Sequence, residues 1–156
     1  MLTYLIQASL DIIERKDAKS IEAEWLEFLY DEVLVYYETD GRDFSGFHLD
    51  KNPFLTNLQA QLGFQLIDDM KNVQEGHENV FYFKNSKGAK IESWFFHLRN
   101  AIAHNRIFVN TDDGSIILQD AKSGNLSMYG EIVSFEKLKD IITGIKNNYK
   151  NEKQQV

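Results

Sequence analysis

The chain has 156 residues, the usual length of one domain, and 43% of them are hydrophobic and 13% aromatic. This composition excludes a disordered segment, and the formal net charge of −7 excludes a protein that coats nucleic acid through a broad basic surface. The chain has no cysteine and no run of about 18 apolar residues. We therefore expect a cytoplasmic protein without disulfides and without a membrane span.

The first half of the chain is predicted to be helical. Apolar residues at helical spacing predict one helix over residues 2–15 and a second over residues 21–38, with Ser20 as its N-cap. Gly and Asp residues mark residues 39–52 as a loop. A third helix is expected over residues 53–70, because the only proline stands at its first position and the helical spacing continues after it.

Residues 80–83 are rich in β-forming residues and are expected to form either a strand or a buried turn. A fourth helix follows a Gly-containing turn. Its apolar residues recur at helical spacing and are Ile91, Trp94, Phe95, Leu98 and Ile102.

A small antiparallel meander is predicted after this fourth helix. Residues 107–110 and 115–119 flank Asp113-Gly114, a dipeptide typical of hairpin turns. A third strand is expected over residues 127–134, and apolar residues from Phe135 onward predict a closing helix. The predicted fold class is therefore mainly α, with a small antiparallel β meander inserted before the last helix.

Charge is distributed unevenly along the chain. Residues 1–50 carry 12 acidic and 4 basic residues, whereas residues 84–106 contain only one acid, Glu92. The basic residues of this second segment are Lys84, Lys87, Lys90, Arg99 and Arg106. This basic island could be a solvated loop, or it could attract an anionic ligand to the fourth helix.

Arg99 is out of place on the fourth helix. On an ideal helix of about 100° per residue, it projects beside the apolar stripe, where a guanidinium needs a partner or a ligand. A phosphate suits its planar fork. Asn100 and His104 lie one above the other on another face, and Arg99 and His104 point about 140° apart. Either the helix loosens at its end, or two chains pair so that two copies of these residues line one cleft; we prefer the pair.

The stretch Arg99-Asn100-Ala101-Ile102-Ala103-His104 resembles the hallmark of the HEPN superfamily, an Arg-x4-His pattern in which the residue after the Arg is often Asn. The resemblance implies an HEPN-like helical bundle, here a single domain over residues 1–150 with a polar tail over 151–156. It also implies a metal-independent endoribonuclease that acts as a homodimer, often as a toxin or an anti-phage defence component with an antitoxin partner.

The resemblance also implies roles for the motif residues. His104 would act as general base or acid at the 2′-hydroxyl or the 5′-oxygen. Arg99 would stabilise the charge on the phosphorane, and Asn100 would orient His104 or the phosphate. We expect further RNA contacts from Lys87, Lys90, His97 and Arg106. We expect no metal, because no histidine has a metal-ligand spacing to nearby acids. We also expect neither a cofactor nor DNA as a partner.

Three other interpretations stay open. Arg99 and His104 could simply bond the last carbonyls of a helix, where the dipole favours them. The chain could be a non-catalytic HEPN-like module that binds RNA, a nucleotide or a protein. It could also be an antitoxin or immunity partner that binds another protein through its acidic first half.

Overall fold

A computed structural model describes most of the chain, with gaps. The described residues are 18–39, 53–61, 63–66, 79–85, 90–122 and 125–154. The predicted helix over residues 2–15 and nearly all of the predicted loop over residues 39–52 lie outside them.

A six-stranded sheet forms the centre of the fold, in the order β1-β4-β5-β6-β3-β2. Antiparallel pairing joins β1, β4, β5, β6 and β3, and the edge strand β2 pairs with β3 in parallel. The strands are β1 (Ala18–Ser20), β2 (Gly63–Leu66), β3 (Val80–Phe83), β4 (Ile107–Asn110), β5 (Ile116–Lys122) and β6 (Asn125–Ile132).

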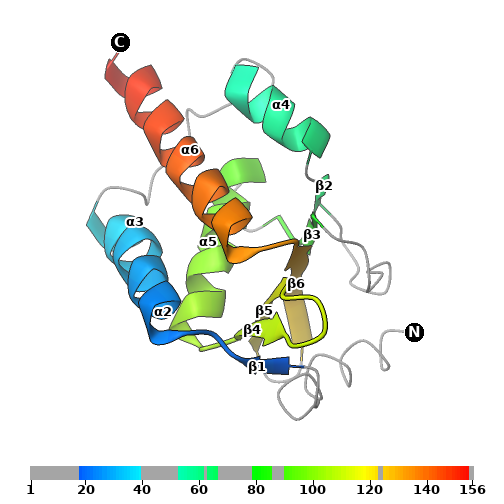
Figure 1. The fold of residues 1–156 in the computed structure, drawn as a ribbon. Coiled ribbons are helices and arrows are strands. Elements are labelled where there is room, and N and C mark those ends of the chain that lie inside the picture. Colours follow the sequence, from blue (N-terminus) through cyan, green and yellow to red (C-terminus); the bar gives the residue numbers. More distant parts are fainter. Residues whose placement is uncertain are drawn as a thin grey trace.

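The helices α2, α3, α5 and α6 lie on one side of this sheet (Figure 1). Within the described residues the helical elements are α2 (Ala23–Leu29), the π-helix η1 (Tyr30–Val35), α3 (Tyr36–Thr39), α4 (Pro53–Gln61), α5 (Lys90–Ala103) and α6 (Phe135–Gln154). The elements α2, η1 and α3 follow one another without a break. Lys146 of α6 holds η1, because its ammonium donates to the Glu32 backbone oxygen at 3.0 Å and pairs with the Glu32 carboxylate.

The sheet corrects the predicted fold class. A mainly α, HEPN-like helical bundle with a small meander is wrong, because the fold is mixed α/β and the meander is part of a larger sheet. The pattern missed β1 and β2, which have three and four residues and are too short for a two-residue alternation to show. The parallel pairing of β2 with β3 is a long-range contact that local spacing does not reveal.

Two helix boundaries change with the sheet. The helix predicted over residues 53–70 ends at Gln61, and Gly63 begins β2. Ser20 ends β1 instead of capping a helix, and α2 starts after Glu22, whose side chain makes no capping hydrogen bond. In both places a strand pairing competes with the helical preference of the segment and wins.

Other predicted elements are confirmed. Residues 80–83 form β3, and the hairpin turns at Asp113-Gly114, where Gly114 has a φ of 75° and Asp113 accepts a hydrogen bond from the Ser115 amide at 2.9 Å. The third predicted strand is β6 and the closing helix is α6. This helix continues to Gln154, into the segment that was expected to be a polar tail.

The main core lies between the helices and one face of the sheet. The apolar stripe predicted for α5 is fully part of it, and Trp94, Phe95 and Leu98 have no exposed surface. The opposite face of the sheet carries a second, smaller buried cluster that includes Tyr82 and Tyr129. Helix α5 is therefore held along its length against the sheet, which sets the direction of its polar residues.

None of the helices in the described ranges is both long enough and apolar enough to cross a bilayer.

Gly130 is the glycine on which the packing of β6 depends. A Cβ atom there would overlap the Phe81 ring, which is fully buried and packs edge-on against Trp94 at 5.5 Å. We expect Gly130→Ala to lower the free energy of unfolding by about 1–3 kcal/mol, because a buried ring cannot move aside. Urea unfolding of wild type and variant measures this.

The double variant Phe81→Leu/Gly130→Ala is the control, because a smaller side chain at position 81 makes room. In the Phe81→Leu background, Gly130→Ala should cost less than in wild type. An equal cost in both backgrounds would contradict the overlap.

Candidate functional site

The end of α5 determines where His104 lies. The Asn105 amide donates to the Ile102 oxygen at 3.1 Å and the Arg106 amide to the Ala101 oxygen at 2.8 Å, and Asn105 has a φ of 56°. These bonds are the Schellman ending of a helix, with Asn in the left-handed position. His104 is consequently the last residue before the turn, and its side chain is exposed.

Arg99 lies beside the apolar stripe, as its spacing predicted. Its Nη1 donates to the Oδ1 of Asn100 at 2.9 Å, and its guanidinium carbon lies 5.8 Å from the centre of the Tyr37 ring. Its Nη2 is 3.5 Å from a carboxylate oxygen of Glu38, and the two side chains are 31% and 46% exposed. Solvent screens such a long, exposed ion pair, so Glu38 neutralises Arg99 only weakly.

A groove of about 440 Å³ opens beside Arg99, between α5 and the helical stretch α2-η1-α3. Its lining is mostly apolar, with Arg99 and Glu38 as the charged residues. The lining residues are Tyr30, Leu34, Val35, Glu38, Thr39, Arg99 and Ala103. The π-helix η1 supplies three of them, and π-helical turns are frequent at functional sites.

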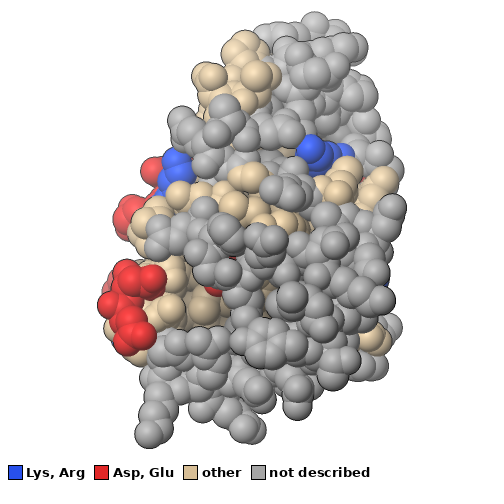
Figure 2. Space-filling view, turned by 90° about the vertical axis from the view of Figure 1, so that its right-hand side faces the viewer, with Lys and Arg blue, Asp and Glu red and all other residues tan. Residues whose placement is uncertain are grey.

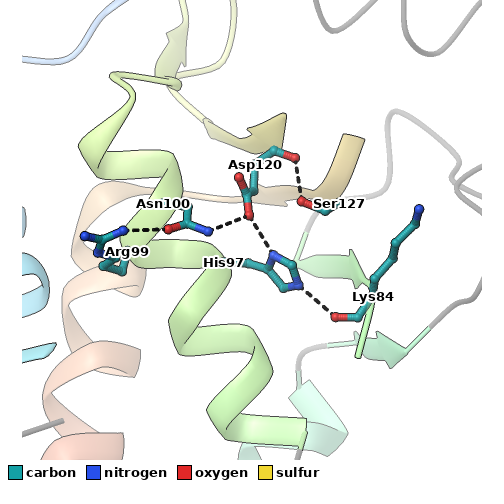
Figure 3. A network of polar contacts seen from close by, with 6 residues as sticks. All are labelled: Lys84, His97, Arg99, Asn100, Asp120 and Ser127. Atoms are coloured by element: carbon teal, nitrogen blue, oxygen red, sulfur yellow. Dashed lines mark hydrogen bonds and ion pairs between the residues drawn. The ribbon is translucent and has the colours of Figure 1, made fainter. Parts of the chain in front are cut away.

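On the other side of α5, a polar network joins the helix to the sheet (Figure 3). Asn100 donates from Nδ2 to the Oδ2 of Asp120 on β5 at 3.1 Å. The same Oδ2 lies 2.7 Å from Nδ1 of His97, and Nε2 of His97 lies 2.7 Å from the backbone oxygen of Lys84. The network therefore runs from Lys84 through His97, Asp120 and Asn100 to Arg99.

This arrangement corrects the expectation that His97 contacts RNA. His97 is 1% exposed, and both of its ring nitrogens have partners inside the protein. One partner is a backbone carbonyl oxygen and the other is a carboxylate oxygen, so both ring nitrogens are engaged inside the fold. His97 forms an internal ion pair with Asp120 and has no face left for a ligand.

The environment of Asp120 favours its ionised form. Burial raises the pKa of the Asp120 carboxyl, but hydrogen bonds from His97 and Asn100 and the charge of His97 together outweigh burial, so the pKa lies below the ordinary value of 3.8. The carboxylate is the form that accepts from both partners, so the hydrogen-bond geometry and the direction of the pKa shift agree.

A β-bulge lies next to Asp120. The register of β5 and β6 shifts between Asp120 and Ala121, and Ser127 is left without a direct partner in the ladder. The Ser127 hydroxyl donates to the Asp120 backbone oxygen at 3.1 Å, which ties the bulge together. Bulges are frequent beside active sites, where they redirect a side chain.

Two other predicted contact residues, Lys90 and Arg106, are not among the members of this network. Lys90 is the first residue of α5 and is half-buried. Arg106 follows the helix end and is also half-buried, and its Nη1 is buried without a hydrogen-bond partner among the described residues. Lys87 lies outside the described residues. On the face drawn in Figure 2, the blue atoms of described Lys and Arg form small separate groups instead of one patch.

The structure thus joins the side chains of Arg99 and Asn100, whereas His104 bonds to the Asn100 backbone oxygen through its own backbone amide at 3.0 Å and is absent from the groove that Arg99 lines. The residues that sequence reasoning missed are Asp120, Tyr37 and Glu38. Asp120 had a visible signal, because it is the only charged residue in the run Ile116–Ala121, where the other side chains are apolar apart from Gln119. Tyr37 and Glu38 had none, because their contact with Arg99 joins positions about 60 residues apart in the chain.

No three His, Asp or Glu side chains of the described ranges lie close enough together to hold a metal ion. Comparisons with protein families, curated proteins and solved structures found no match to this chain. The resemblance to the HEPN superfamily therefore rests on the six-residue motif and its position at the end of α5.

The ion pair between His97 and Asp120 makes a pH dependence testable. Because the pKa of Asp120 is lower in the folded than in the unfolded state, its contribution to stability is present above about pH 3.8 and is lost as the pH falls through the folded-state pKa. Asp120→Asn should lose about 3 kcal/mol at pH 7, since it removes the carboxylate charge opposite His97, and the loss should shrink toward pH 2.

Urea midpoints of wild type and Asp120→Asn between pH 7 and pH 2 measure this loss. Ile142→Val is the control, because it trims a fully buried side chain without a titratable group and should cost about 1 kcal/mol at every pH. A constant difference between wild type and Asp120→Asn across this range would contradict the assigned ion pair.

Proposed function

We propose that this chain is a metal-independent endoribonuclease in which Arg99, Asn100 and His104 cleave an RNA phosphodiester at a site shared by two copies of the chain. The motif supports the proposal because it is the one that HEPN ribonucleases share. We place the enzyme among toxins or anti-phage defence components, some of which are paired with an antitoxin protein. The net charge of −7 favours one specific RNA over bulk RNA.

The state of Arg99 is the observation that carries the proposal. A neutral amide holds its Nη1, and its carboxylate contact with Glu38 is long and exposed. A close, buried carboxylate would neutralise a guanidinium more fully, because solvent screens such a pair much less. Arg99 instead keeps its charge at the edge of a groove, where a phosphate could replace the contact with Glu38.

The proposed chemistry uses the side chains of His104 and Arg99. The 2′-oxygen attacks the adjacent phosphorus, an O2′–P bond forms, and the P–O5′ bond breaks. His104 carries one of the two protons, either away from the 2′-hydroxyl or to the 5′-oxygen, and water carries the other. Arg99 stabilises the charge that collects on the phosphoryl oxygens. The products are a 2′,3′-cyclic phosphate and a 5′-hydroxyl.

Two copies of the chain are part of the proposed site, because Arg99 and His104 of one copy do not line the same groove. Arg99 faces the groove, whereas His104 lies at the exposed helix end and is absent from the groove lining. The same groove side exposes apolar surface, with Tyr30 56% and Val35 47% exposed. We propose that a two-fold pair covers this surface and brings the Arg99 of one copy to the His104 of the other.

Cleavage of RNA by purified protein in EDTA tests the activity. We expect His104→Ala to lower kcat by about 10²–10⁴-fold, because the proton transfer is lost, and Arg99→Ala to lower it by about 10²–10³-fold, because the charge stabilisation is lost. Gel assays on total RNA and on tRNA, with end-group analysis of the products, measure this.

Lys137→Ala is the matched control, since it removes a cation from α6 and should cleave like wild type. If wild type does not cleave any RNA tested, the non-catalytic binding module becomes the better interpretation. Equal cleavage by wild type and His104→Ala would show that a contaminating nuclease is responsible.

Mixing two inactive variants tests whether the site is shared. In a mixed pair of Arg99→Ala and His104→Ala chains, a shared site contains the intact Arg99 of one copy and the intact His104 of the other. We expect about a quarter of the wild-type activity to return, because half of the pairs are mixed and each has one intact site. Sedimentation should give about twice the chain mass of 18.2 kDa. A monomer, or no recovery on mixing, would overturn the shared site.

A further inference from the structure

One oxygen atom serves two partners in the network between α5 and β5. The Oδ2 of Asp120 accepts from Nδ2 of Asn100 at 3.1 Å and lies 2.7 Å from Nδ1 of His97 (Figure 3). Asp120 is 5% exposed, so water competes little for this oxygen. The two hydrogen bonds are therefore coupled through a single atom.

The carboxylate determines which way the Asn100 amide faces. A side-chain amide has a donor end and an acceptor end, so the partner of one end sets the direction of the other. An ionised carboxylate only accepts, and Asn100 must turn its NH2 group to Asp120. Its oxygen then faces away from Asp120 and accepts from Nη1 of Arg99 at 2.9 Å.

We propose that Asp120 is a positioning residue of this site, which acts through the Asn100 amide to hold the Arg99 guanidinium in place for the phosphate. The inference rests on the proposed ribonuclease function for its catalytic consequence, although the hydrogen bonds on which it depends do not. His97 belongs to the same network, because its Nδ1 lies 2.7 Å from the oxygen of Asp120 that also accepts from Asn100.

Replacing the Asp120 carboxylate by an amide should break the chain of hydrogen bonds that runs through Asn100 to Arg99. In Asp120→Asn, one atom still faces both His97 and Asn100, and it is now either an oxygen or an NH2 group. Without the carboxylate charge a buried imidazole is favoured in its neutral form, and because Nε2 faces the Lys84 backbone oxygen, Nδ1 is then the acceptor. The new amide therefore turns its NH2 group to Nδ1 of His97, and this NH2 group opposes the NH2 group of Asn100. Asn100 then turns over, and its NH2 group faces Arg99 where its oxygen had been.

A double-mutant cycle with Asn100→Ala separates positioning from general destabilisation. We expect Asp120→Asn to lower kcat about 100-fold with KM changed less than about 3-fold, since Arg99 is displaced and not removed. In the Asn100→Ala background, the link to Arg99 is already cut, so Asp120→Asn should change kcat less than about 2-fold. Asp140→Asn on α6 is the matched control and should behave like wild type.

Each assay is run at a temperature where circular dichroism shows the variant to be folded. If Asp120→Asn does not fold under any condition tested, Asp120→Glu takes its place in the cycle, because it keeps the charge and displaces the oxygen. If the double variant lowers kcat by the product of the two single effects, the positioning role is wrong. An unchanged kcat in a folded position-120 variant would also overturn it.

Nitrogen NMR of the Arg99 guanidinium is a readout that does not depend on activity. In wild type, the bond from Nη1 to Asn100 should slow rotation and separate the Nη1 and Nη2 signals, and Asp120→Asn should merge them. If wild-type protein does not cleave RNA but the signals merge in the variant, the positioning stands and the ribonuclease function fails. If the signals are the same in both proteins, the positioning role is wrong.

Discussion

The hydrogen bonds to one carboxylate oxygen of Asp120 link the core of this protein to its candidate site. The Oδ2 atom joins β5 to two residues of α5, His97 and Asn100, at 2.7 and 3.1 Å. A buried carboxylate is costly unless it is paired and fully hydrogen-bonded, and here His97 and Asn100 are its partners. Because the Asn100 oxygen then faces Arg99, the charge state of a buried group determines how a half-exposed guanidinium is held.

The fold separates the site into an internal part and a surface part. Packing of α5 against the sheet places His97 and Asp120 inside, and the helix ending at Asn105 leaves His104 on the outside. Arg99 lies between them at the edge of a mostly apolar groove. In a single copy Arg99 lines the groove and His104 does not, which is the reason that we propose a site shared by two copies.

Much of the second half of the chain could be predicted from its sequence, because its signals are local. The apolar spacing of α5 and α6 and the Asp113-Gly114 turn act within a few residues, and the structure has these elements. The first half was predicted less well. The strands β1 and β2 form through pairing with β4 and β3, so their formation depends on partners distant in the sequence. His97 was misjudged for the same reason, because its burial depends on Asp120 and Lys84 from other elements.

The sequence by itself determined the motif, the helix that carries it and the unusual position of Arg99 beside an apolar stripe. These follow from residue order and from the 3.6-residue period of a helix, which needs no tertiary contact. Only the tertiary structure decided that the fold is mixed α/β, that His97 and Asp120 form an internal pair and that Arg99 meets Tyr37 and Glu38. The reason is physical: strand pairing and the partners of a buried charge depend on side chains that the chain brings together only when it folds.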